Sequence, residues 1–147
     1  DGTGPEIWSG SVGRITDFVS TLGTSGTFMG TSRFLKDQST RVRCHAVQPD
    51  SPFHGLEGMK HMESALVPSI YTPEGLADSH LGAPTEASYE LVRRLAQEEG
   101  LLTGISSGAA VWAALEIGRQ LEHGLVVAIL PDGGARYLSD SHLWETP

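Results

Sequence analysis

The sequence of 147 residues is poor in cysteine and in basic side chains, and both shortages exclude whole classes of protein. Cys44 is the only cysteine, so the chain can form no internal disulfide and no multi-cysteine zinc site. Lys and Arg number 10 against 18 Asp and Glu, which gives a formal net charge of -8. Without a basic cluster we expect no nucleic-acid partner, and without an apolar run of about 18 residues we expect no membrane span.

The spacing of the histidines and the lack of cysteine also bear on metal chemistry and location. The six histidines show neither H-E-x-x-H nor tight H-x-x-x-H order, so we expect no metal site. A chain with one cysteine suits a reducing compartment, and we expect the protein to be cytoplasmic.

The first third of the chain has the pattern of a strand, a helix and a second strand. Residues 15–20 (ITDFVS) are rich in β-branched and aromatic side chains, residues 26–36 repeat apolar side chains at helical spacing, and residues 42–47 (VRCHAV) alternate. A strand-helix-strand unit makes its two strands parallel neighbours.

The second half continues with two helices and a further strand. Residues 85–99 form an amphipathic pattern, with Thr85 suited to the N-cap and Gly100 to the C-terminal stop. An alanine-rich helix is expected to end near residue 121, and residues 125–130 (LVVAIL) are continuously apolar, as in a central parallel strand. We therefore predict one α/β unit with an open, mostly parallel sheet flanked by helices.

Residues 48–69 form a long connection that is rich in proline and glycine. The sequence places Met59, Met62, His54 and His61 between these residues. Connections of this length without regular structure are either functional or plain surface insertions, and the sequence alone favours neither.

The segment GTSGT joins the expected end of a strand to the start of a helix. The first N–H groups of a helix lack partners and its dipole is positive there, so an anion is favoured. Gly23 and Gly26 let the backbone approach a phosphate closely. Hydroxyl donors come from Thr24, Ser25 and Thr27. The segment is neither a Walker loop nor G-x-G-x-x-G, so it indicates either a phosphate or carboxylate ligand or a plain tight turn.

Two further turns of small residues follow the same pattern. The segment GISSGA leads into the alanine-rich helix, where Ser106 and Ser107 would be N-caps if the turn is only structural. The segment PDGGARY follows the strand expected at residues 125–130. Since parallel strands end at one edge of a sheet, the three turns together indicate a ligand site at that edge.

Four ordered motifs resemble one family over nearly the whole chain. TGPEIW, GTSGTFMGTSRFLK, EEGLLTGISSGAA and PDGGARYLSD resemble the carboxyl-terminal half of the cysteine synthases, also called O-acetylserine sulfhydrylases. These enzymes belong to the pyridoxal-phosphate-dependent β-family together with cystathionine β-synthase, and residues 48–68 look closer to the B-type synthases. The resemblance implies that residues 1–147 are the carboxyl-terminal, cofactor-binding part of a longer chain. The lysine that forms the Schiff base would lie in an upstream half absent from this sequence.

The resemblance also implies roles for particular residues. The segment at residues 23–27 would wrap the phosphate of pyridoxal 5′-phosphate, with Ser25 standing where glycine or threonine is usual. Ser106 matches the serine that hydrogen-bonds the pyridine nitrogen, and Asp132 would lie near the ring edge. A neutral hydroxyl does not force the nitrogen to hold a proton, so it weakens the ring as an electron sink and suits β-elimination.

Other residues are expected to serve the fold rather than the chemistry. Ser107 is interpreted as a helix cap, and Arg136 and Tyr137 as anchors of the strand's exit. Lys36 is expected at the solvated end of a helix. Lys60 lies in no context that matches the catalytic lysine, so we expect no catalytic residue in this chain.

The implied activity is that of a cysteine synthase, a homodimer that converts O-acetylserine or a similar ester and a sulfur donor into cysteine. Because the lysine is missing, the 147 residues alone are predicted to be inactive. The alternatives are a cystathionine β-synthase-like or serine/threonine dehydratase-like enzyme, or a non-catalytic α/β module that binds a phosphate-bearing ligand. The GISSGA and RYLS matches favour a synthase over a dehydratase.

Overall fold

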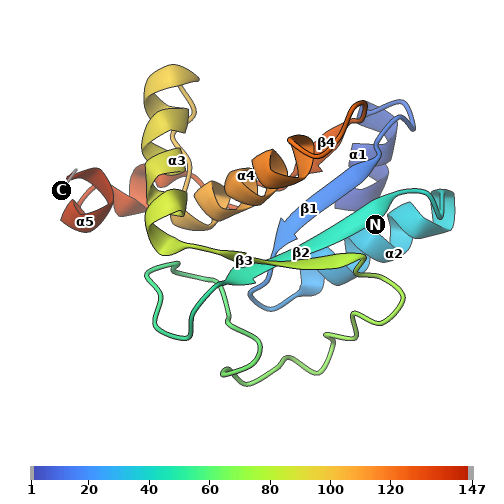
Figure 1. Ribbon diagram of the computed structural model, residues 1–147, viewed down its shortest axis with the longest axis horizontal. Coiled ribbons are helices and arrows are strands. Elements are labelled where there is room, and N and C mark those ends of the chain that lie inside the picture. Colours follow the sequence, from blue (N-terminus) through green and yellow to red (C-terminus); the bar gives the residue numbers. More distant parts are fainter. Residues whose placement is uncertain (1, 146–147) are drawn as a thin grey trace.

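Four parallel strands form the sheet of the computed structural model, which describes residues 2–145 (Figure 1). The strand order is β3-β2-β1-β4. The strands are β1 (Asp17–Thr21), β2 (Arg43–Pro49), β3 (Ser79–Ala83) and β4 (Val126–Ala128). The predicted open, parallel α/β sheet is confirmed.

Helices cover both faces of this sheet (Figure 1). They are α1 (Thr3–Gly10), α2 (Gly26–Gln38), α3 (Thr85–Glu98), α4 (Ile105–Gly118), the 3-10 helix η1 (Gly134–Tyr137) and the short α5 (Ser141–Trp144). Consecutive residues of β1 face opposite sides: Phe18 stacks on Phe28 of α2 with ring centroids 6.4 Å apart, whereas Val19 packs in the core that contains Ala109 of α4. Among residues 2–145, no helix has the length and apolar character that a membrane crossing requires.

The strand expected at residues 125–130 is shorter than predicted and lies at an edge of the described sheet, not at its centre. Its continuous apolar run has another cause. Val126 and Ala128 pack against the core on the α4 side, while Val127 and Ile129 pack against the core on the α2 side. Both faces of the strand are covered, so apolar residues follow one another along it instead of alternating with polar ones.

The short strand β3 was not predicted, because its sequence SHLGA has few of the β-branched and aromatic residues that favour strands. The strand depends on its neighbour, since its residues pair in parallel register with the stretch from His45 to Pro49 of β2. Gly82 suits this position because a Cβ there would lie 3.1 Å from the Cα of Asp50.

Two expected helix caps are wrong. Pro84 is the N-cap of α3, and the hydroxyl of Thr85 instead accepts a hydrogen bond from the N–H of Gly55, at 3.2 Å. Gly104 is the N-cap of α4, which places Ser107 inside the first turn. The buried hydroxyl of Ser107 has no hydrogen-bond partner within residues 2–145, so it caps nothing.

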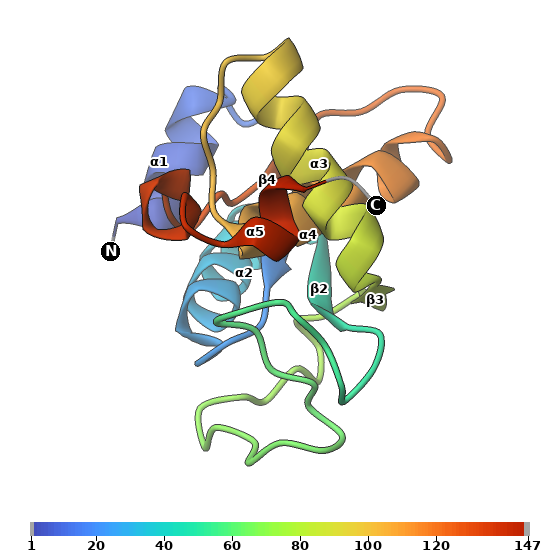
Figure 2. The same ribbon diagram turned by 90° about the vertical axis from the view of Figure 1, so that its left-hand side faces the viewer.

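Residues 50–78 connect β2 to β3 without a helix or strand. Three buried side chains anchor this connection, Leu56, Met59 and Met62. The N–H of Lys60 also donates to the carbonyl of Leu22 just after β1, at 2.8 Å. Figure 2 shows the connection beside the carboxyl ends of the strands, where it forms one wall of the candidate site.

Candidate functional site

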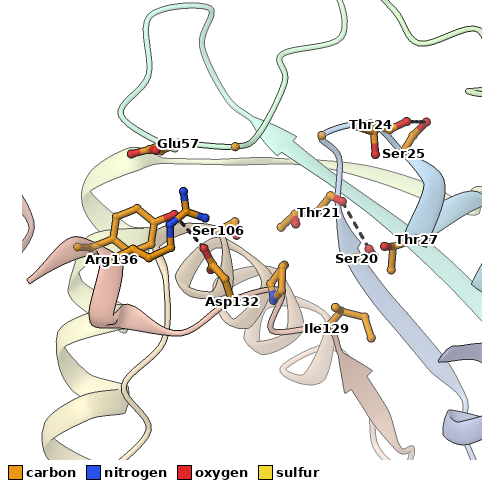
Figure 3. Close-up of a pocket in the computed structure, with 14 residues that line it drawn as sticks. Ser20, Thr21, Thr24, Ser25, Thr27, Glu57, Ser106, Ile129, Asp132 and Arg136 are labelled. Atoms are coloured by element: carbon orange, nitrogen blue, oxygen red, sulfur yellow. Dashed lines mark hydrogen bonds between the residues drawn. The ribbon is translucent and has the colours of Figure 1, made fainter. Parts of the chain in front are cut away.

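A cavity of about 310 Å³ lies where β1 ends, between the first turns of α2 and α4 (Figure 3). Six of the seven residues predicted to bind a ligand line this cavity: Gly23, Thr24, Ser25, Thr27, Ser106 and Asp132. The seventh, Gly26, lines a neighbouring hollow against α1. Two turns that are about 80 residues apart in sequence therefore open into one cavity, although the second turn follows no strand of the described residues and has only the isolated bridge of Thr103 with Gly133.

The first turn of α2 forms one end of the cavity. This helix begins at Gly26 and has 13 residues, so its first N–H groups lack helical partners and lie at the positive end of the dipole. Figure 3 shows Thr24, Ser25 and Thr27 around this end. Backbone amides and hydroxyl groups together suit the oxygens of a phosphate.

The two glycines of this turn, Gly23 and Gly26, have different surroundings. A Cβ at Gly23 would lie 2.5 Å from the carbonyl oxygen of Gly58, which belongs to the connection at residues 50–78. At Gly26 the nearest atoms to a Cβ would be Ile70 Cδ1 at 3.8 Å and Thr24 Oγ1 at 3.9 Å, which is ordinary contact. Glycine is thus required at position 23 by the segment that contains Gly58, whereas a Cβ at Gly26 would make only ordinary contacts.

Ser25 has a backbone conformation that is rare outside glycine. Its φ of 68° lies in the left-handed region, and its hydroxyl donates to the carbonyl of Thr24 at 2.6 Å. The left-handed conformation costs about 1–2 kcal/mol for a residue with a Cβ. Strain of this kind is often kept where a loop must present its amides to a ligand.

We expect Ser25→Gly to raise the free energy of unfolding by about 0.5 kcal/mol, because the relief of strain exceeds the lost hydrogen bond and the added chain entropy. Ser25→Val should lower it by about 2 kcal/mol, since a β-branched side chain fits this φ poorly. Chemical denaturation of the three proteins measures both changes. Equal stability of the glycine and valine variants would contradict the strained backbone.

Ser106 and Asp132 are fixed relative to each other by backbone contacts. The N–H of Gly104 donates to the carbonyl of Asp132 at 3.0 Å, and Thr103 forms an antiparallel bridge with Gly133. A Cβ at Gly104 would overlap the carboxylate of Asp132. Only glycine there lets this carboxylate lie against the first turn of α4, where the helix dipole favours negative charge.

Only one of the two carboxylate oxygens of Asp132 has a hydrogen-bond partner among the described residues. Its Oδ2 accepts a hydrogen bond from the hydroxyl of Tyr137 at 2.9 Å, whereas its buried Oδ1 has no partner within residues 2–145. Burial, and then the hydrogen bond to Asp132, raise the pKa of Tyr137 to about 12. Tyr137 thus lines the cavity and holds one oxygen of Asp132, and the other oxygen of Asp132 is an acceptor left over at the site.

The raised pKa of Tyr137 can be read by phenolate absorbance, because the chain has only three tyrosines. Burial also raises the pKa of Tyr71 and Tyr89, but Tyr137 should ionise last, at about pH 12. We expect Tyr137→Phe to remove that last step and leave the other two. A variant that retained the step near pH 12 would show that another tyrosine causes it.

Two charged residues at the cavity were not predicted as site residues. Glu57 lines it from the connection at residues 50–78, and Arg136 lines it from η1 (Figure 3). Arg136 is exposed and has no ion pair within the described residues, so its expected role as an anchor is wrong. No sequence signal marks Glu57, because only the path of an irregular segment brings it here.

Neither lysine lines the cavity. Lys36 was expected to be solvated, but its side chain is 16% exposed and its Nζ lies 2.7 Å from Asp78 Oδ2 and 3.2 Å from the carbonyl of Val42. Lys60 donates to the carbonyl of Leu66 at 3.4 Å. Within residues 2–145, no three His, Cys, Asp or Glu side chains are grouped as around a metal ion. The described residues thus bring donors for an anion to the cavity, but no amine.

The fold and the cavity define a class, the open α/β proteins that bind a phosphate-bearing ligand beyond the carboxyl ends of parallel strands. The family model described as "Pyridoxal-phosphate dependent enzyme" matches residues 1–132. The chain belongs to this family.

Individual relatives point to cysteine synthases. The chain is 45% identical over 141 residues to a cysteine synthase of Aquifex aeolicus, covering 93% of this chain and 43% of the relative. It is 42% identical over 137 residues to cysteine synthase B of Pseudomonas aeruginosa, covering 93% and 45%. Isoform 3 of O-acetyl serine sulfhydrylase from Entamoeba histolytica has a similar structure, with a TM-score of 0.90, 32% identity, and coverage of 98% and 45%. The chain spans less than half the length of these relatives.

Proposed function

We propose that residues 1–147 are the carboxyl-terminal, cofactor-binding part of a cysteine synthase whose catalytic lysine lies upstream. One observation carries the proposal: the first turn of α2 and the hydroxyl of Ser106 line the same cavity. The names of the relatives and the extent of the match to each support it.

The residues of the cavity fit pyridoxal 5′-phosphate. The amides at the start of α2 and the hydroxyls of Thr24, Ser25 and Thr27 suit its phosphate. Ser106 would hold the ring nitrogen, with Asp132 near the ring edge. When bound, this cofactor supplies an electron sink for reactions at the α- and β-carbons of an amino acid.

The chain's own residues bind and orient rather than react. The 13-residue α2 would direct the positive end of its dipole at the phosphate, and Ser106 is buried in the first turn of α4. As a neutral partner, this hydroxyl accepts or donates a hydrogen bond without enforcing a charge on the nitrogen. The wall at Glu57 and Gly58 limits the access of water from one side.

We infer that the longer protein makes cysteine from O-acetylserine or a similar ester and a sulfur donor. It would act as a cytoplasmic homodimer. A second candidate is transfer to a thiol amino acid, because an O-acetylserine-dependent cystathionine β-synthase of Bacillus subtilis is 37% identical over 142 residues.

The test compares the longer protein, loaded with cofactor, with the 147 residues alone. We expect the longer protein to release cysteine from O-acetylserine and sulfide, and the isolated chain to release none. Replacing sulfide by homocysteine decides between the two candidates, and light scattering reports whether the protein is a dimer. Cysteine formation by the isolated chain would contradict the proposal, and so would a longer protein that forms neither cysteine from sulfide nor cystathionine from homocysteine.

A further inference from the structure

A second polar cluster lies at the opposite edge of the sheet from the cofactor cavity. Asp17 is the first residue of β1, and Ser79 is the first residue of β3. His45 of β2 lies between these strands and pairs with Ser79 in the parallel register. The amino ends of three neighbouring strands thus place an acid, an imidazole and a hydroxyl side by side.

Hydrogen bonds connect the three groups of this cluster in series. Ser79 Oγ lies 2.7 Å from His45 Nδ1, and His45 Nε2 lies 2.8 Å from Asp17 Oδ1. Asp17 is 0% exposed. Arg43 Nε lies 3.0 Å from Asp17 Oδ1, and Arg43 Nη2 lies 3.0 Å from Asp17 Oδ2. Thr16 donates a further hydrogen bond at 2.7 Å.

These contacts determine which nitrogen of His45 holds the proton. Burial opposes the ionised form of Asp17, but the hydrogen bonds from Thr16, His45 and Arg43 together lower its pKa, so it is a carboxylate near neutral pH. A carboxylate only accepts hydrogen bonds, so Nε2 donates to it. The lone pair of Nδ1 is then directed at the hydroxyl of Ser79, the arrangement of a nucleophile beside its base.

The cluster opens into a cavity of its own. About 360 Å³ of space is lined by the whole cluster and by apolar walls, namely Asp17, Arg43, His45, Ser79, Leu81, Ile117, Gln120 and Leu121. Ser79 is half-buried and lines this space. None of these residues lines the cofactor cavity.

We propose that Ser79 is a nucleophile, with His45 as its general base, for acyl transfer from small activated esters with an apolar acyl group. The apolar walls supplied by Leu81, Ile117 and Leu121 set the class of acyl group. The site is independent of the proposed cysteine synthase activity, because all its groups lie within this chain and apart from the cofactor.

The proposed reaction needs only the ester and water as reactants. The oxygen of Ser79 forms a bond to the acyl carbon, its proton passes to His45 Nδ1, and the departing alkoxide takes that proton as its bond to carbon breaks. Water then hydrolyses the acyl-serine by the same proton route. Arg43 has N–H groups beyond the two that bind Asp17, and it supplies positive charge to the developing oxyanion.

The experiment uses the longer protein with its cofactor and a biotin-tagged fluorophosphonate as probe. The Ser79 oxygen displaces fluoride from phosphorus, and His45 takes the proton. We expect peptide mapping to find the label on Ser79, and the Ser79→Ala variant to lose labelling by about 100-fold. Hydrolysis of p-nitrophenyl butyrate should fall by a similar factor, while cysteine synthesis is unchanged.

A matched control is present in the same chain. Ser64 Oγ lies 2.8 Å from Nδ1 of His61, but His61 has no carboxylate partner within the described residues. Ser64→Ala should leave labelling unchanged. Because the labelled residue is mapped in the unmodified protein, the result does not depend on whether the Ser79→Ala variant folds. Label absent from Ser79, or equal on Ser64 and Ser79, would overturn the proposal.

Discussion

Replacing Gly23 with alanine should lower the affinity for pyridoxal 5′-phosphate by about 100-fold, or about 2.7 kcal/mol. A Cβ at this position would lie 2.5 Å from the carbonyl oxygen of Gly58, so one of the two backbones must move. The Gly58 segment is held by the hydrogen bond from Lys60 N–H to Leu22, at 2.8 Å. If residues 22–24 move, the backbone N–H groups that would bind the phosphate move with them. The overpacked side chain also lowers the free energy of unfolding by about 1–3 kcal/mol.

Titration of the cofactor-free longer protein, followed by the absorbance of the cofactor, measures this loss. Gly30→Ala is the matched control, because a Cβ at Gly30 in α2 meets no atom within 4 Å. That variant should bind the cofactor normally and gain about 0.5 kcal/mol of stability from better helix propensity. Wild-type affinity in the Gly23→Ala variant would show that the wall at Gly58 does not constrain the phosphate turn.

Asp17→Ala should lower the free energy of unfolding by about 3 kcal/mol. The carboxylate is fully buried and joins the amino ends of β1 and β2, because it accepts hydrogen bonds from Thr16, Arg43 and His45. Its removal leaves the buried imidazole of His45 without its acceptor, and it also ends the ion pair with Arg43, whose side chain is half exposed. Chemical denaturation of the two proteins side by side gives the difference.

The same carboxylate makes stability depend on pH with a defined sign. Its pKa in the folded protein lies below the ordinary value of 3.8, so its contribution is present above that value and is lost as pH falls through the lowered pKa. The stability gap between the wild type and Asp17→Asn should therefore shrink from about pH 5 to about pH 3. The exposed Asp37 is the control, and Asp37→Ala should change stability by less than about 0.5 kcal/mol. A gap that grew on acidification would contradict the direction of the shift.

Local patterns predicted much of this fold and of its candidate site. The alternation in residues 42–47 predicts the strand β2, and the small residues after β1 predict the turn that leads into α2. Each pattern needs only a few consecutive residues. The expectation that Ser106 lies at the same edge as Thr24 is also confirmed, although the described residues between α3 and α4 form no strand and the turn is placed by the bridge between Thr103 and Gly133. These features depend on neighbours in sequence or on topology.

The remaining features depend on contacts between distant segments, which no short pattern records. β3 exists because β2 offers it a partner, and Glu57 reaches the cavity only through the path of residues 50–78. Asp17 and His45 are unremarkable in sequence and meet because two strands adopt one register. Gly23 shows both cases: its place at the phosphate turn was predicted, but the carbonyl that requires it was not.

A crystal structure of the longer protein with bound pyridoxal 5′-phosphate tests the central claim most directly. We predict phosphate oxygens within hydrogen-bond distance of the backbone N–H groups of residues 23–27, and the ring nitrogen within that distance of Ser106 Oγ. A phosphate bound away from the first turn of α2, or a ring nitrogen that contacts a residue other than Ser106, would contradict it.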